Sequence, residues 1–205
     1  EHPAARVAVV SAASAYQLGG GVLTGGRHVL EEALCMQTTL YASLARAKEL
    51  ARQKDLRDAH GQNIHIPEDG CVVHPDVEVL RAGTDTGYAL LDTPRTLCAV
   101  ISMAMPNKNY RLVGYDSISG PKYKNVVQSK FGAALRAAIS CSVDMLVIPD
   151  CGCGVFQNDP RDVGMLLGKV LSKVDGRLQK VLLVGQRSFA DAAIDAFGRR
   201  YAGDN

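Results

Sequence analysis

The chain has 205 residues, of which 47% are hydrophobic and 21% charged, and its 23 basic and 21 acidic residues leave a net charge of +2. A charge this close to zero gives no general attraction to nucleic acid or to a membrane surface, so neither is expected as a partner. The length suits one large domain over residues 1–205, with a core that needs no disulfide or structural metal. The chain contains no apolar run of 18 residues and no signal-peptide pattern at its start, and we expect a monomer.

The cysteines favour free thiols over a disulfide framework. Cys98 lies in an apolar run, and Cys35 and Cys141 lie in predicted helices, where a thiol packs as a small hydrophobic group. The remaining cysteines are Cys71, Cys151 and Cys153. Because Cys151 and Cys153 lack the partners that would complete a tetrahedral zinc site, we expect no metal and no other cofactor. The expected setting is reducing and intracellular, of the cytoplasmic type, with a secreted effector as the alternative.

The first half of the chain begins with a predicted strand over residues 6–13, which is rich in valine and ends in small residues. Apolar positions at helical spacing predict one helix over residues 29–54, and a polar, glycine-containing loop follows over 55–70. Residues 71–81 predict one or two short strands interrupted by Pro75.

The second half alternates buried strands with helices. Almost unbroken apolar runs predict strands over residues 96–104, 144–149 and 180–185, each buried on both faces. The predicted helices cover 126–141, 163–174 and a last segment that Ser188 caps and that ends at Phe197, and 106–124 is a polar connection. The alternation predicts an α/β domain of three layers around a central, mixed and largely parallel sheet.

A triple glycine followed by two acidic residues is the most informative motif. Gly19, Gly20 and Gly21 free the backbone to turn tightly against a ligand, and Glu31 and Glu32 open a helical segment soon afterwards. A loop that can hold phosphates thus precedes an acid that can donate or accept a proton. This pairing suggests chemistry on a phosphorylated sugar, although two glutamates in a first helical turn can equally serve the helix dipole alone.

A second glycine-rich loop over residues 150–160 joins a predicted buried strand to a helix. Ligands of α/β sheets bind beyond the carboxyl ends of strands, where such a turn presents N–H groups to anions. Phe156 in this loop can stack on a flat or sugar ring. The two loops together suggest a diphosphate held from both sides, whereas the alternative is two structural turns with Phe156 in the core. No Lys-Ser/Thr pair follows the first glycines, which argues against a Walker-type nucleotide site.

These motifs resemble the poly(ADP-ribose) glycohydrolase branch of the macrodomains, in its bacterial type. The signature of that family is three glycines, a short spacer and Gln-Glu-Glu, and the corresponding segment here runs from Gly19 to Glu32. Residues 73–81 and 104–107 are similar to later blocks, and 152–160 is similar to the second phosphate loop. The resemblance implies a macrodomain fold and an ADP-ribosyl glycohydrolase that acts on poly(ADP-ribose) or on ADP-ribosylated proteins.

The resemblance also implies a role for each matching residue. Glu32 would be the main catalytic residue, protonating the leaving oxygen as the C1–O bond of the ribose breaks, and Glu31 would orient Glu32 or the substrate hydroxyls. Phe156 would position the distal ribose, and Asn158 would hold its loop or reach a ribose hydroxyl. The residues that would hold the diphosphate are Gly19, Gly20, Gly21 and Val22 in the first loop, and Gly152, Cys153, Gly154 and Val155 in the second.

Departures from the family pattern leave other functions open. Leu30 stands where the family has glutamine, which keeps removal of single ADP-ribose units, from arginine or an acidic side chain, as an alternative to polymer cleavage. No acidic residue that would hold adenine can be assigned. A non-catalytic ADP-ribose reader would need the loops but not the glutamates, and an unrelated nucleotide-binding protein is the third alternative. We expect His60 and His65 to be solvated surface residues, while His28 lies close to the glutamates in sequence.

Overall fold

The structure is a computed structural model that describes residues 5–25, 29–113, 118–174 and 178–202. Its five strands form one sheet in the order β2-β3-β1-β4-β5, in which only β2 runs antiparallel to its neighbour. The strands are β1 (Val7–Ala12), β2 (Val72–Arg81), β3 (Leu90–Met103), β4 (Met145–Pro149) and β5 (Lys180–Val184). This arrangement confirms the α/β class and the largely parallel sheet.

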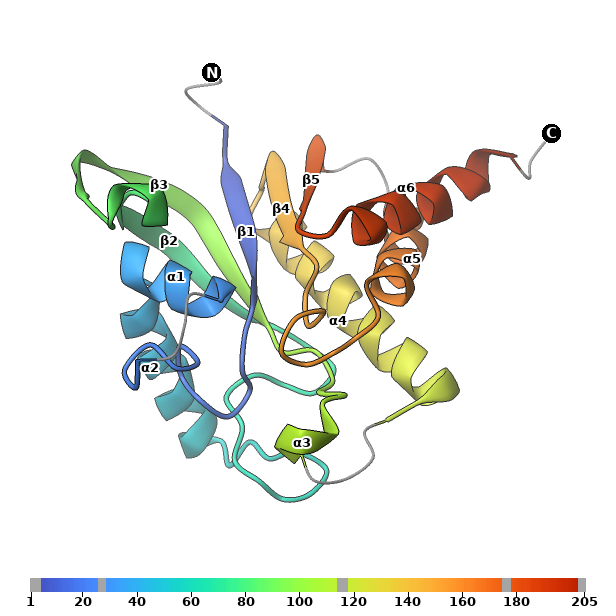
Figure 1. Ribbon diagram of the computed structural model, residues 1–205, viewed down its shortest axis with the longest axis horizontal. Coiled ribbons are helices and arrows are strands. Elements are labelled where there is room, and N and C mark those ends of the chain that lie inside the picture. Colours follow the sequence, from blue (N-terminus) through green and yellow to red (C-terminus); the bar gives the residue numbers. More distant parts are fainter. Residues whose placement is uncertain (1–4, 26–28, 114–117, 175–177, 203–205) are drawn as a thin grey trace.

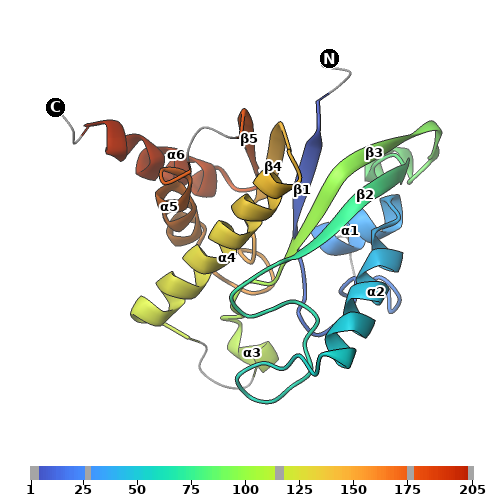
Figure 2. The same ribbon diagram turned by 180° about the vertical axis from the view of Figure 1, so that it is seen from behind.

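Helices cover both faces of this sheet (Figures 1 and 2). They are α1 (Leu30–Gln37), α2 (Leu40–Gln53), α3 (Tyr110–Val113), α4 (Gly120–Ser140), α5 (Pro160–Leu171) and α6 (Arg187–Ala202). On β3, Val100 packs against Leu44 of α2, while its neighbour Ile101 lies in the larger core with Phe131 of α4. Successive residues of a strand point to opposite faces, so these contacts place α2 on one side of the sheet and α4 on the other. No described helix is long and apolar enough to cross a membrane.

The helix expected over residues 29–54 is two helices, so that prediction is wrong at its centre. Thr38 adopts an extended conformation with φ −136° and ψ 174°, and it forms an isolated antiparallel bridge with Val79 of β2. The Thr39 N–H donates to the Glu78 carbonyl at 3.0 Å, and the Glu78 N–H donates to Thr39 Oγ1 at 3.0 Å. Two β-branched residues thus leave the helix to pair with the sheet, a long-range contact that helical periodicity does not reveal.

Pro75 does not interrupt β2, which is one continuous strand and not the short pieces considered from the sequence. The strand lies at the edge of the sheet, and β3 is its one neighbour among the described strands, with Pro75 opposite Ala99. An edge strand has one row of N–H groups without sheet partners, so it tolerates a proline. The early half of β3 extends beyond the expected segment and is mostly exposed, and only its later residues, up to Met103, are fully buried.

Two helices begin earlier than expected because proline is compatible with a first helical turn. Helix α4 begins at Gly120, with Pro121 in its first turn and Tyr123 buried, so part of the polar segment 106–124 is helical. Helix α5 begins at Pro160, where the Asp159 side chain caps it by accepting from the N–H groups of Arg161 and Asp162.

Strand β5 was expected to be buried on both faces and is instead the second edge of the sheet. Its residues alternate between exposed and half-buried, with Leu182 and Val184 on the exposed face. Helix α6 begins at Arg187, so Ser188 lies inside the helix and does not cap it.

A buried polar cluster lies between α2 and the sheet, and it contradicts the expected exposure of His65. His74 Nδ1 lies 2.8 Å from Ser43 Oγ, and its Nε2 lies 3.1 Å from Ser102 Oγ. His65 is 2% exposed, and neither of its ring nitrogens has a hydrogen-bond partner among the described residues. Burial lowers the pKa of each imidazole to about 4. Both side chains are therefore neutral in the folded protein at neutral pH.

Candidate active site

The two glycine loops lie at the same edge of the sheet. Residues 13–29 connect β1 to α1, and residues 150–159 connect β4 to α5. Strands β1 and β4 are parallel neighbours, so their carboxyl ends meet at one edge, and both connections leave from it (Figure 1). The position is the usual ligand-binding place of an open α/β sheet.

The Glu32 side chain is hydrogen-bonded to the backbone of the first glycine loop. Its Oε1 accepts a hydrogen bond from the Gly21 N–H at 2.8 Å, and its side chain is 5% exposed. Gly20 has φ 56°, a conformation that favours glycine, and a Cβ at this position would overlap Glu32 Oε1. The glycines therefore allow the loop to lie directly on the carboxylate.

Glu31 occupies an equivalent position against the end of β1. Its Oε2 accepts from the Ser14 N–H at 3.0 Å, and the side chain is 3% exposed. Burial raises the pKa of Glu31 to about 7, and the nearby Glu32 charge adds to this, while hydrogen bonds from the backbone of Ser14 and Gly19 oppose it. Glu31 thus exchanges its proton near neutral pH.

Each glutamate keeps one oxygen without a protein partner. Glu31 Oε1 and Glu32 Oε2 are buried and accept no hydrogen bond from the described residues. Buried polar atoms are normally paired, and unpaired ones call for an explanation such as a substrate or a catalytic role. The two free oxygens can accept from sugar hydroxyls or exchange a proton with a substrate. A purely structural pair that only serves the helix dipole would not need to be buried in this way.

Asn158 holds the second glycine loop together from inside. It is 2% exposed, and its Nδ2 donates to the carbonyls of Gly152 and Pro106, each at 2.9 Å. Its Oδ1 accepts from the Tyr123 hydroxyl at 2.9 Å. Because these contacts use the amide fully on the protein side, Asn158 supports the loop, which is the first of its two expected roles.

The second loop presents its backbone donors outward. The N–H groups of Gly154, Val155 and Phe156 donate no hydrogen bond to any other described residue, whereas that of Cys153 donates to the Asp150 carbonyl at 3.1 Å. Val155 is 52% exposed, and a Cβ on Gly154 would meet nothing within 4 Å. Successive free N–H groups in a turn form a concave site for an anion.

The backbone N–H groups of the first loop, unlike those of the second, already donate hydrogen bonds within the protein. The sequence had suggested that both loops present these groups to a diphosphate. Gly20 N–H donates to the Gln17 carbonyl at 3.3 Å, and Val22 N–H donates to the Gly19 carbonyl at 3.1 Å. Gly21 N–H is the donor to Glu32 described above. A diphosphate would therefore have to replace these bonds on the first loop, but not on the second.

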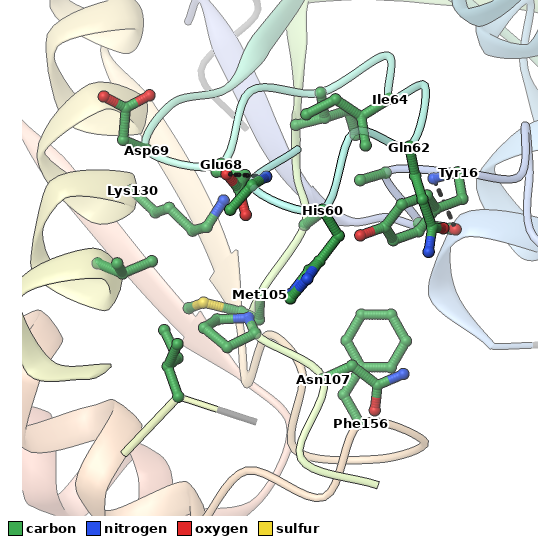
Figure 3. Close-up of a pocket in the computed structure, with 18 of the residues that line it drawn as sticks. Tyr16, His60, Gln62, Ile64, Glu68, Asp69, Met105, Asn107, Lys130 and Phe156 are labelled. Carbon is green, nitrogen blue, oxygen red and sulfur yellow. Dashed lines mark hydrogen bonds between the residues drawn. The ribbon is translucent and has the colours of Figure 1, made fainter. Parts of the chain in front are cut away.

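A cavity of about 460 Å³ adjoins the two loops. Its wall includes Ser14, whose N–H holds Glu31, and Phe156 of the second loop, and residues 59–69 contribute the opposite side (Figure 3). Phe156 is half-buried against the main core and also lines this cavity, and its stacking on a ring stays a prediction.

The described cysteines and histidines do not form a metal centre. All six cysteines are free, and the described residues contain no group of three or more His, Cys, Asp or Glu side chains that could hold a metal ion. Cys153 is half-buried, with its Sγ 3.7 Å from the Cys151 carbonyl. His60 is exposed, as expected, and it also lines the cavity. Gly26, Arg27 and His28 lie outside the described residues.

Three supports of the site were missed from the sequence. Ser14 acts through its backbone N–H, which no residue type signals. Tyr123 was assigned to a polar connection, although an aromatic residue two positions after Pro121 is a possible core position of an early helix. Residues 107–109 brace the second loop, with the Lys108 N–H donating to the Phe156 carbonyl at 2.9 Å and Asn109 Nδ2 to the Val155 carbonyl at 3.0 Å.

Comparisons with known proteins support the resemblance seen in the glycine loop. A family model for the catalytic domain of microbial-type poly(ADP-ribose) glycohydrolase (PARG) matches residues 1–82, a range that contains the first glycine loop and both glutamates. No curated protein matches the sequence significantly.

Solved structures extend the likeness over nearly the whole chain. The fold is similar to the crystal structure of PARG from Thermomonospora curvata, with a TM-score of 0.69 and 29% identity over 96% of this chain and 69% of that one. The same enzyme bound to the inhibitor ADP-HPD gives 0.71 and 29%, over 96% and 71%. PARG from Deinococcus radiodurans in complex with ADP-ribose gives 0.68 and 25%, over 96% and 77%. The chain is thus similar to the microbial-type poly(ADP-ribose) glycohydrolases, in sequence over its first 82 residues and in fold over almost its entire length.

Proposed function

We propose that residues 1–205 form one macrodomain unit that binds ADP-ribose and hydrolyses the glycosidic bond at C1 of its distal ribose. The observation that carries this proposal is the pair of buried glutamates, each with one oxygen fixed by a backbone N–H and one oxygen without a partner among the described residues. A reader would need only the loops. Two partly satisfied buried carboxylates are costly in a protein that performs no chemistry with them.

In this proposal, the second glycine loop binds the diphosphate and Phe156 positions the distal ribose. The free N–H groups of Gly154 and Val155 support that role, together with Gly152, whose φ of 74° shapes the turn. The first loop, from Gly19 to Val22, closes on the other side of the ligand, exchanging part of its internal bonds for contacts with the diphosphate. In this proposal, Cys153 contributes to diphosphate binding only through its backbone, which forms part of the second loop.

Glu32 is proposed as the acid and base of the reaction. The C1–O bond breaks through an oxocarbenium-like state, so the leaving oxygen needs a proton, and the attacking water must later lose one. Glu31 orients the substrate hydroxyls through its free Oε1, and its pKa of about 7 lets the pair hold a proton at neutral pH. Two close carboxylates share protons more readily than they carry two charges.

The alternative substrate is a protein that carries single ADP-ribose units, linked through arginine or an acidic side chain. This alternative is supported by Leu30, the half-buried first residue of α1. Leu30 stands beside the two glutamates, at the position where the family has glutamine. We expect Leu30→Gln to shift relative rates towards polymer if that position selects the substrate.

The test is an assay with automodified, radiolabelled protein that separates polymer, free ADP-ribose and label that remains on protein. Release of ADP-ribose by the wild type and not by Glu32→Gln supports the hydrolase, and the labelled species that disappears identifies the substrate. Tight binding of ADP-ribose with no release from any substrate would show a reader. ADP-ribose that neither binds in calorimetry nor raises the melting temperature would contradict the proposal as a whole.

A further inference from the structure

Helix α1, which carries both glutamates, has few apolar anchors of its own. It is eight residues long, and its buried side chains are those of Glu31 and Glu32. Leu34 and Cys35 are half-buried and pack against the smaller core beneath α2. Val29, the residue before the helix, has no polar side chain to cap its first turn. A helix this short is marginal in water by itself, so contacts at its two ends must fix its position.

The N-terminal end of α1 is held by the glutamates themselves. Glu31 accepts from the Ser14 N–H at 3.0 Å, and Glu32 accepts from the Gly21 N–H at 2.8 Å. In the proposed function, the first glycine loop exchanges part of its internal bonds as it closes on the ligand. The support at this end of the helix therefore changes when the ligand binds, and an anchor elsewhere is needed to keep the carboxylates in place.

That anchor is a joint formed by Thr38 and Thr39 at the C-terminal end of α1. Thr38 Oγ1 donates to the Leu34 carbonyl in the last turn of α1 at 2.6 Å. The same oxygen accepts from the N–H of Leu40, the first residue of α2, at 3.1 Å. One buried hydroxyl thus ends α1 and begins α2, which fixes the angle between the two helices.

Thr39 binds this joint to the outer edge of the sheet. Its N–H donates to the Glu78 carbonyl and its Oγ1 accepts from the Glu78 N–H, each at 3.0 Å. Glu78 belongs to the edge strand β2, so the two bonds attach the joint to a rigid element of the fold. Glu32 lies roughly one and a half helical turns before the end of α1, so a tilt at the joint moves its carboxylate.

We propose that Thr39 is a positioning residue, whose paired bonds with Glu78 set the orientation of α1 and so the place of the Glu32 carboxylate at the reacting bond. The inference rests on the proposed hydrolase function. A displacement of about 1 Å in a catalytic group can lower a rate by about 10²-fold. The second glycine loop lies between β4 and α5 and is held by Asn158, so the affinity for the diphosphate does not depend on this joint.

The test is Thr39→Val, which keeps the branched shape and the backbone N–H but removes the oxygen that accepts from Glu78. We expect the rate of ADP-ribose release at saturating substrate to fall about tenfold, while the ADP-ribose affinity in calorimetry stays within about twofold. Thr39→Ser keeps the hydroxyl and should retain a rate within about threefold of the wild type. Thr96→Val, at an exposed position of β3 opposite Glu78, is the matched control and should change neither quantity.

The outcomes separate the positioning role from the proposed function. A wild type that binds no ADP-ribose, or releases none from any substrate, would contradict the function and the inference with it. A wild-type rate in Thr39→Val would overturn the positioning role and leave the function in place. Equal losses of rate and affinity in Thr39→Val would also overturn it, because a role confined to stability weakens the whole site. One exposed hydrogen bond is a small part of the total stability, so Thr39→Val should fold, as its melting temperature will show.

Discussion

The two glycine loops leave neighbouring parallel strands at one edge of the sheet, yet they are built in opposite ways. The first loop uses its N–H groups internally and closes on Glu32, one of the residues proposed for the chemistry. The second loop is held from behind by the buried Asn158 and leaves the N–H groups of Gly154 and Val155 open. We infer that the second loop supplies most of the affinity for an anionic ligand, and that the first couples closure on the ligand to catalysis.

The largest expected effect separates the two glutamates of the first loop. Glu32→Gln should lower the rate of ADP-ribose release by about 10²–10⁴-fold, because the amide keeps the bond from Gly21 N–H but cannot supply a proton. ADP-ribose affinity, measured by calorimetry on the same protein, should be nearly unchanged. Glu31→Gln serves as the paired variant and should lose less activity. A larger loss in Glu31→Gln would move the role of the acid to Glu31.

Removal of the support behind the second loop should cost both stability and affinity. Asn158→Ala leaves the buried Tyr123 hydroxyl and the Pro106 carbonyl without this partner, while the Gly152 carbonyl keeps the bond from the backbone N–H of residue 158. A buried polar group left unpaired costs about 1–3 kcal/mol. Urea unfolding should show the loss of stability, and calorimetry the weaker binding of ADP-ribose. Asn63→Ala, at an exposed position, is the control. If Asn158→Ala binds ADP-ribose like the wild type, the shape of the second loop does not determine affinity.

A substitution on the outer side of the second loop should affect binding alone. Gly154→Val adds a side chain where no atom lies within 4 Å, so the melting temperature should change little. The branched side chain would occupy the space of the ligand and should weaken ADP-ribose binding by about tenfold or more. Gly198→Val on α6 also enters open space and should leave the affinity unchanged. Wild-type affinity in Gly154→Val would show that this loop is only a structural turn.

The smallest expected effect is a dependence of stability on pH from Glu31. Its pKa is about 7 in the folded protein and 4.5 in the unfolded chain, so the folded state binds more protons between these values. The free energy of unfolding should therefore fall as the pH rises from 4.5 to 7, through this group. Glu31→Gln should remove that contribution, which urea titrations at pH 5 and pH 8 measure by comparison with the wild type. An unchanged difference between the two pH values would contradict the raised pKa.

Features that depend on residues close together in the sequence were predicted correctly more often than features that depend on residues far apart in it. The strand over residues 7–12 and the glycine loop before Glu32 follow from local pattern, and both are present as expected. The break at Thr38 depends on a bridge to Val79, which lies 41 positions further along the chain and which no window of the sequence includes. Whether a strand lies at the edge of a sheet also cannot be predicted from local sequence. Strand β5 has the apolar sequence of a buried strand, and only the strand order shows that it is an edge.

The site shows the same division. The acids and glycines of the candidate site were proposed from residue types and spacing, whereas Ser14 contributes a backbone N–H and could not be recognised from its side chain. The hydrogen bond from the Tyr16 hydroxyl to Asp58 Oδ2, beside the cavity, also had no sequence signal, because the two residues lie 42 positions apart.

The neutral histidines beneath α2 make unfolding a proton-consuming process in mild acid. His65 and His74 have a pKa of about 4 in the folded protein and 6.5 in the unfolded chain, so the unfolded state binds more protons between these values. The free energy of unfolding therefore falls as the pH drops from 6.5 towards 4, with two imidazoles acting against the single opposite contribution of Glu31. Mild acid thus lowers the stability of the fold that holds α2, the helix that follows α1 and its two glutamates, against the sheet.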